Sequence, residues 1–183
     1  ETMSNYRRSR FNGSTYFFTV VTYQRRPIFN HPECVKYLRD SIKEVRKNHP
    51  FTIDAWILLP EHMHSIWTLP DKDYDYSKRW GLIKSGFSQR AKGYLPAIKN
   101  SKSRIKHRES LFWQRRFWEH EIRSEDDFRN HMDYIHYNPV KHGHVEKVQD
   151  WPFSTFHKYV KDGIYPIDWC GGDVDRFINE YGE

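Results

Sequence analysis

Residues 51–69 read Phe51-Thr52-Ile53-Asp54-Ala55-Trp56-Ile57-Leu58-Leu59-Pro60-Glu61-His62-Met63-His64-Ser65-Ile66-Trp67-Thr68-Leu69, and this stretch decides the fold. Both halves are rich in β-branched and aromatic residues, which favour strands. The link Pro60-Glu61 is short, so the two strands are predicted to pair as an antiparallel hairpin. Side chains two residues apart on a strand point to the same face. His62 and His64 are therefore expected to stand side by side, with Met63 packed on the opposite face.

The same patterns predict the other elements. Residues 15–22 and 117–122 read as strands, and residues 32–47 show apolar side chains at helical spacing. A second helix is predicted over residues 77–92, and residues 93–108 read as a polar, basic, mobile loop. Ser124 is a typical N-cap before three acidic residues, so a third helix is expected from there to about Asn138, where Pro139 disfavours its continuation.

This order, β-α-β-β-α-β-α, predicts an α+β protein. Its first six elements match a ferredoxin-like, split β-α-β sandwich with an antiparallel sheet and helices on one face. We expect one domain over residues 1–150. Residues 151–183 are less regular and are predicted to form a C-terminal extension that packs on or near it.

Charge and composition narrow the range of partners and cellular locations that this protein can have. The 183 residues carry 30 Lys and Arg against 24 Asp and Glu, and 17% of them are aromatic. A basic surface suits a phosphate-rich partner, and aromatic rings stack on unpaired bases, although rings also fill small cores. The chain has no apolar run long enough to span a membrane, so no membrane partner is expected. Cys34 and Cys170 form no disulfide or zinc pattern, which favours a cytoplasmic location.

The histidine pair suggests a metal site. Two imidazoles suit an open site that leaves positions for a substrate oxygen, whereas a closed structural zinc site needs four ligands. On the third predicted helix, Tyr134 and Asn138 are four residues apart and share a face, whereas Tyr137 points away. Taken alone, the histidines also suit a structural or solvated strand face, and Tyr134 suits a boundary aromatic.

Two longer strings resemble those of a known family. They are Leu59-Pro60-Glu61-His62-Met63-His64 and Asp133-Tyr134-Ile135-His136-Tyr137-Asn138-Pro139-Val140-Lys141-His142-Gly143. Together they resemble the REP-associated tyrosine transposases, which are single-tyrosine relatives of the HUH (His-hydrophobe-His) endonucleases. The strings at residues 117–120 and 151–155 extend the resemblance to nearly the whole chain, and the match is poorest around residues 96–108.

The resemblance implies a metal-dependent endonuclease and strand transferase that acts through a covalent 5′-phosphotyrosine. Tyr134 would be the nucleophile, and His62 and His64 would bind Mg²⁺ or Mn²⁺. Asn138 stands where related small transposases place a glutamine, so it would complete the metal site directly or through water. The implied partner is single-stranded DNA folded into a hairpin from REP elements.

Basic and aromatic clusters are the candidate DNA-binding residues: Arg7, Arg8, Arg10, Arg115, Arg116 and Trp118. Two other functions stay open, a catalytically silent hairpin-binding protein and a structural zinc protein. The general base is also open among His120, His131 and His136. Both a monomer and a homodimer are compatible with the sequence.

Overall fold

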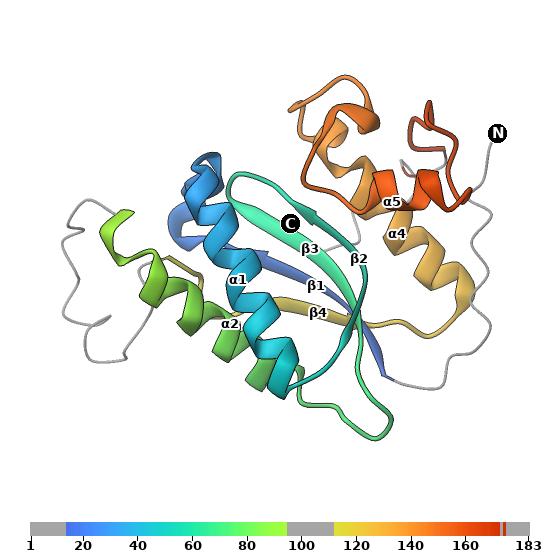
Figure 1. Cartoon of the computed structure of the whole chain (residues 1–183). Helices are drawn as coiled ribbons and strands as arrows, with labels where there is room; N and C mark the ends of the chain where they lie inside the picture. Colours follow the sequence, from blue (N-terminus) through green and yellow to red (C-terminus); the bar gives the residue numbers. More distant parts are fainter. Residues whose placement is uncertain (1–13, 95–111, 173, 175–183) are drawn as a thin grey trace.

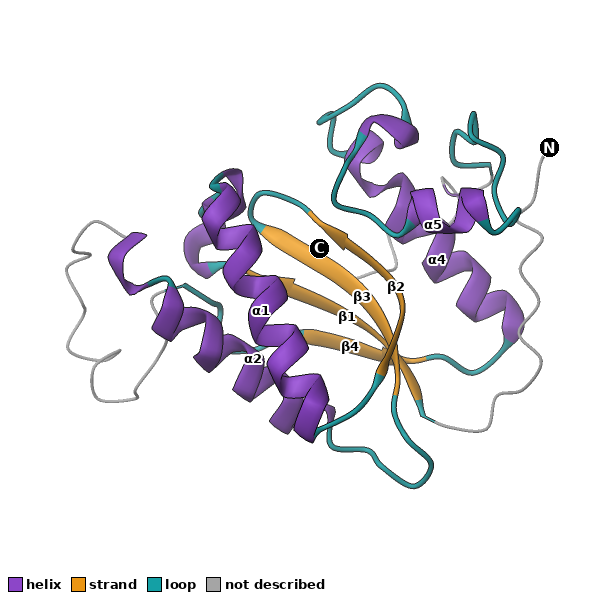
Figure 2. Ribbon diagram, viewed as in Figure 1, coloured by secondary structure: helices purple, strands orange, loops and turns teal. Residues whose placement is uncertain are grey.

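The computed structural model describes residues 14–94, 112–172 and 174. Its centre is a four-stranded antiparallel sheet with the order β2-β3-β1-β4 (Figure 2). The strands are β1 (Thr15–Val21), β2 (Thr52–Leu58), β3 (His62–Thr68) and β4 (Trp118–Glu121). β2 and β3 form the predicted hairpin across Pro60-Glu61, with Leu58 opposite Met63.

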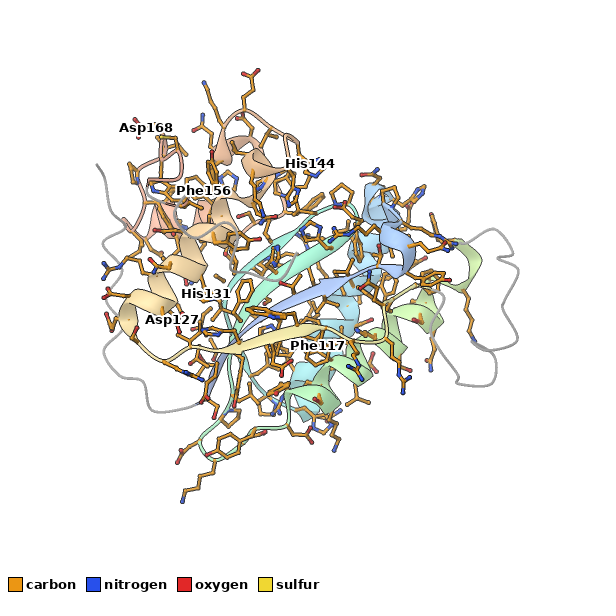
Figure 3. The ribbon with its side chains drawn as sticks, turned by 180° about the vertical axis from the view of Figure 1, so that it is seen from behind. Phe117, Asp127, His131, His144, Phe156 and Asp168 are labelled. Atoms are coloured by element: carbon orange, nitrogen blue, oxygen red, sulfur yellow. The ribbon has the colours of Figure 1, made fainter. Side chains whose placement is uncertain are left out.

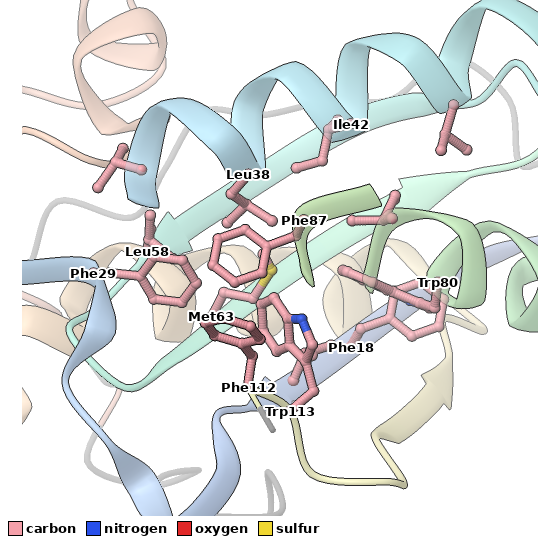
Figure 4. Close-up of a cluster of buried hydrophobic side chains, with 14 of the residues drawn as sticks. Phe18, Phe29, Leu38, Ile42, Leu58, Met63, Trp80, Phe87, Phe112 and Trp113 are labelled. Carbon is pink, nitrogen blue, oxygen red and sulfur yellow. The ribbon is translucent and has the colours of Figure 1, made fainter. Parts of the chain in front are cut away.

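Two helices cross one face of this sheet. Helix α1 (Pro32–Asn48) connects β1 to β2, and α2 (Tyr76–Arg90) connects β3 to β4 (Figure 1). Together with the strand order, these connections give the predicted ferredoxin-like arrangement. The core between helices and sheet is largely aromatic, and Figure 4 shows Phe18, Met63 and Trp80 within it.

A third long helix, α4 (Glu125–Lys141), packs on the opposite face. The prediction of helices on one face therefore holds for α1 and α2 and does not extend to α4. The reason is visible in β1, where all seven residues are buried. Since alternate strand residues point to opposite faces, a strand with no exposed side needs cover on both. Met132 and Ile135 of α4 provide that cover, packing in one apolar cluster with Phe17 of β1.

Helix α4 begins where the sequence predicts but ends three residues later than predicted. Ser124 is the N-cap, and its hydroxyl accepts a hydrogen bond from the Asp127 N–H at 3.0 Å. At the other end the predicted stop near Asn138 is wrong, because the helix continues through Pro139 to Lys141. Proline removes one N–H donor, but the His142 N–H still donates to the Asn138 carbonyl at 3.0 Å, which keeps the last turn closed.

The described residues after α4 pack along β2 and α4. Leu58 N–H donates to the Phe153 carbonyl at 2.9 Å, and Trp56 N–H donates to the Thr155 hydroxyl at 3.0 Å. These bonds cover the outer edge of β2, which would otherwise present unpaired backbone groups. Helix α5 (Phe156–Lys161) follows, and Phe156 joins the apolar cluster that includes α4.

Short 3₁₀ turns complete the described chain, at Tyr23–Arg25, Ile28–Asn30, Lys92–Tyr94 and Val148–Asp150. Most of the predicted loop at residues 93–108 lies outside the described residues. Both cysteines are free thiols, Cys34 buried and Cys170 exposed. Among the helices of the described ranges, none combines the length and the apolar character that crossing a bilayer requires.

Candidate active site

The two histidines of β3 lie on the sheet face that α4 covers. Their ring centroids are 5.0 Å apart, and both side chains are buried. Met63, between them in sequence, points into the core on the α1 and α2 side. Strand alternation therefore brings the imidazoles together as expected.

Each imidazole is oriented by a second residue. His62 Nδ1 lies 2.9 Å from Glu61 Oε1, and His64 Nδ1 lies 2.9 Å from Thr19 Oγ1. The hydrogen bond from His62 is the main cause that lowers the pKa of Glu61, so Glu61 is a carboxylate at neutral pH and His62 Nδ1 donates to it. With Nδ1 engaged in both rings, Nε2 is the atom that each ring offers to a metal ion.

Helix α4 runs alongside the histidine pair. The ring of Tyr134 lies 5.2 Å from that of His64, and the ring of His142 lies 5.1 Å from that of His62. Asn138 is spaced midway between Tyr134 and His142 on one helical face, so its buried side chain faces the pair.

Tyr137, the neighbouring tyrosine of α4, points elsewhere. Its ring packs 6.5 Å from that of Trp169, and the Cα of Gly171 lies so close that a Cβ there would be 2.6 Å from the Tyr137 ring. The geometry thus agrees with the expectation that Tyr134, and not Tyr137, shares a site with Asn138.

This donor set fits a divalent cation. Two buried imidazoles and one buried amide can offer nitrogen and oxygen ligands from two adjacent elements. Three protein ligands with open positions are typical of catalytic rather than structural metal sites.

Lys141 is a site residue that the sequence reasoning missed. Its Nζ donates a hydrogen bond to the Tyr134 hydroxyl at 3.2 Å and lies 5.0 Å from the centre of that ring. Lys141 follows Tyr134 by seven residues, which is two helical turns. That spacing indicates that the two side chains share a helical face, but Lys141 lies beyond the end of the helix that the sequence predicts.

The three histidines considered as general bases are engaged elsewhere. His120 Nε2 lies 2.9 Å from Asp127 Oδ2, and His131 Nδ1 lies 3.0 Å from Asp127 Oδ1. His136 Nε2 lies 2.8 Å from the Thr155 hydroxyl, among the residues that follow α4. Burial lowers the pKa of His131 to about 4 and that of His136 to about 3, so both are neutral at pH 7.

The predicted DNA-binding residues are placed in part. Trp118 lies opposite Thr19 in the β1–β4 pairing, and its ring packs 5.6 Å from that of Phe17, on the same face as His64. Arg115 and Arg116 are exposed just before β4. The predicted arm of Arg7, Arg8 and Arg10 lies outside the described residues.

Comparison with known proteins decides the family. The family model described as "Transposase IS200 like" matches residues 6–138. The REP-associated tyrosine transposase of Escherichia coli strain K12 is 48% identical over 178 residues, covering 97% of this chain and 98% of that protein. The chain belongs to the REP-associated tyrosine transposases. The resemblance stated from the two sequence strings is confirmed, as is the prediction of an enzyme.

Further REP-associated tyrosine transposases agree with this assignment. A putative member from Haemophilus influenzae (strain ATCC 51907 / DSM 11121 / KW20 / Rd) is 45% identical, covering 96% of this chain and 98% of that protein. A solved structure described as a REP-associated tyrosine transposase bound to a REP hairpin is 49% identical. It superimposes with a TM-score of 0.77, covering 99% of this chain and 98% of that one. The predicted α+β fold with an antiparallel sheet is therefore confirmed.

Proposed function

We propose that this REP-associated tyrosine transposase cuts and rejoins single-stranded DNA beside a REP-type hairpin, with Tyr134 as the nucleophile. The observation that carries the proposal is the placement of the Tyr134 ring 5.2 Å from that of His64, which itself lies 5.0 Å from that of His62. The buried Asn138 follows Tyr134 by one helical turn. The hairpin substrate is supported by the similar protein of known structure, whose bound ligand is a REP hairpin.

The proposed reaction is a phosphoryl transfer to the protein. The Tyr134 oxygen forms a bond to phosphorus, and the bond from phosphorus to the 3′-oxygen breaks. The products are a tyrosyl 5′-phosphate and a free 3′-hydroxyl. A 3′-hydroxyl attacking the same phosphorus reverses the step and joins a strand. Because the ester bond conserves the energy of the phosphodiester, the cycle needs no ATP.

His62, His64 and Asn138 are proposed to hold the divalent ion, Mg²⁺ or Mn²⁺. When bound, such an ion polarises a non-bridging phosphate oxygen and offsets its charge. Glu61 and Thr19 keep the two imidazoles in the orientation that this requires.

The reactive oxygen is shielded in this conformation. Tyr134, His64 and Asn138 are 0% exposed, and His62 is 1% exposed. A DNA phosphate therefore reaches the Tyr134 oxygen only after the groups around it move. We infer that hairpin binding comes first and that the site opens as the DNA docks.

DNA contacts are proposed for two clusters. Arg115, Arg116 and Trp118 lead into β4, whose Trp118 shares a sheet face with His64. The N-terminal Arg7, Arg8 and Arg10 are proposed to bind phosphates, because guanidinium groups pair with phosphate oxygens.

Lys141 is proposed to stabilise the negative charge that develops on the Tyr134 oxygen as its proton leaves. A hydrogen bond to a charged group contributes about 1.5–3 kcal/mol, so we expect Lys141→Met to slow adduct formation about 10- to 100-fold. Single-turnover measurements with saturating hairpin DNA separate this effect from binding. Lys141→Arg should recover much of the rate, and Lys147→Met, at an exposed position, is the matched control. A wild-type rate in Lys141→Met would contradict this role.

The function is tested with a labelled oligonucleotide that carries a REP-type hairpin next to a single-stranded segment. The protein is incubated with it in Mg²⁺, in Mn²⁺ or in EDTA, and the products are separated on denaturing gels. A labelled protein band that needs the metal and the hairpin supports the proposal, and a scrambled oligonucleotide without the hairpin is the control. Hairpin binding without an adduct under any of these conditions would favour the catalytically silent alternative.

A further inference from the structure

A second group of metal-ligating side chains lies where β4 meets α4. It consists of His120 from β4 and Asp127 and His131 from α4, and their ligand atoms all lie within 4.8 Å of one another. Asp127 and His131 are four residues apart and share a helical face. In Figure 3, Asp127 and His131 lie on α4 beside the sheet.

This cluster is separate from the proposed active site. The Phe17 ring lies between the two, 4.7 Å from the His131 ring and 5.4 Å from the His64 ring. The pairing of β1 with its neighbours explains the separation, since Phe17 pairs with His120, whereas Thr19 pairs with His64. The two groups thus occupy successive rows of the same sheet face.

The donor chemistry suits a transition metal. Two imidazoles and one carboxylate are ligands that Zn²⁺, Co²⁺ and Ni²⁺ accept, with further positions filled by water. The side chains of His120 and Asp127 are 32% and 21% exposed, so an ion can enter from solvent. His131 is the buried member, with its side chain 3% exposed.

The hydrogen bonds within this cluster would have to change before an ion could bind. His120 Nε2 lies 2.9 Å from the Asp127 carboxylate. His131 Nδ1 lies 3.0 Å from that carboxylate and 2.8 Å from the Asp127 backbone carbonyl, so an ion would have to displace these hydrogen bonds. The two imidazole rings are nearly parallel, at 15° and 4.7 Å between centroids. Parallel rings do not aim their nitrogens at one point, so coordination requires the partly exposed His120 ring to turn.

We propose that His120, Asp127 and His131 bind a divalent transition-metal ion that fastens α4 to β4. The strand β4 has only four residues and pairs with β1 alone among the described strands. Tyr134 lies on α4 one turn beyond His131. An ion at this junction therefore holds the tyrosine-bearing helix to the edge of the sheet, without touching the reacting atoms.

The test isolates this site from the first one. The variant His64→Leu removes a ligand of the proposed catalytic ion, and Zn²⁺ titration is followed by calorimetry. We expect His64→Leu to bind one equivalent of Zn²⁺ at the second site and the double variant His64→Leu/His120→Gln to bind none. The control His64→Leu/His157→Gln, which alters an exposed histidine outside both groups, should keep that equivalent.

Two further measurements distinguish the loss of a metal ligand from a loss of Zn²⁺ binding that is caused by misfolding. Co²⁺ should give a ligand-field absorption spectrum in His64→Leu that disappears when His120→Gln is added, while circular dichroism stays unchanged. Zn²⁺ should slow amide hydrogen exchange in residues 125–134 of the wild-type protein and not of His120→Gln. Absence of Zn²⁺ binding in His64→Leu, or equal binding in both double variants, would overturn the proposal. Because the readouts are metal binding and hydrogen exchange, their outcome does not depend on whether Tyr134 cleaves DNA.

Discussion

Replacing Tyr134 with phenylalanine is expected to abolish the covalent protein–DNA adduct while hairpin binding stays nearly unchanged. The substitution removes one oxygen atom, which is the proposed nucleophile, and leaves the ring in its place between His64 and Phe17. The fold should tolerate the change, because losing the hydrogen bond that the charged Lys141 donates costs about 1.5–3 kcal/mol at most. Binding is measured by gel shift, and adduct formation is measured on denaturing gels with the same labelled hairpin.

Tyr137→Phe is the matched control for this experiment. Tyr137 lies three residues further along α4, but its ring packs towards Trp169. We therefore expect Tyr137→Phe to form the adduct at the wild-type rate. If Tyr134→Phe still became attached to DNA, another residue would have to be the nucleophile, and the proposed mechanism would fail.

Local sequence patterns were sufficient for most of the sheet and for its histidine pair. The alternation in residues 51–69 predicts the β2–β3 hairpin, and it places His62 and His64 on one face because strand periodicity is two. The side chain of Ser124 and the acids after it mark the start of α4 correctly, since capping is a local interaction.

What the sequence could not supply depends on packing between distant elements. Helix α4 covers the face that α1 and α2 leave open, because β1 presents apolar side chains on both of its faces. The periodicity of α4 alone does not reveal this. The contact between Lys141 and Tyr134 requires a helix that continues past Pro139, and tertiary packing overrides the local preference there. The group of His120, Asp127 and His131 forms only when β4 and α4 pack together, so no continuous sequence motif predicts it.

Replacing His64 with leucine is expected to weaken Mn²⁺ binding at the proposed active site by more than about 100-fold, because a direct ligand matters at least as much as its supporting groups. Adduct formation should fall with it, whereas hairpin binding should persist. Leucine has a comparable size but no atom that can bind a metal. The variant therefore tests the imidazole nitrogen as a ligand and largely preserves the packing of the side chain. Mn²⁺ binding is measured by electron paramagnetic resonance in proteins that also carry His120→Gln, so that the second site does not contribute to the signal.

A graded variant distinguishes a metal ligand from a histidine that merely fills space. Thr19→Val keeps the shape of the side chain but removes the hydroxyl 2.9 Å from His64 Nδ1. Since loss of such an orienting partner costs about 10- to 100-fold in metal affinity, Thr19→Val should fall between wild type and His64→Leu in both Mn²⁺ affinity and adduct rate. Higher Mn²⁺ concentrations should restore the adduct rate of Thr19→Val but not that of His64→Leu. Equal Mn²⁺ affinities in all three proteins would show that His64 has a structural role and would remove the metal from the proposed mechanism.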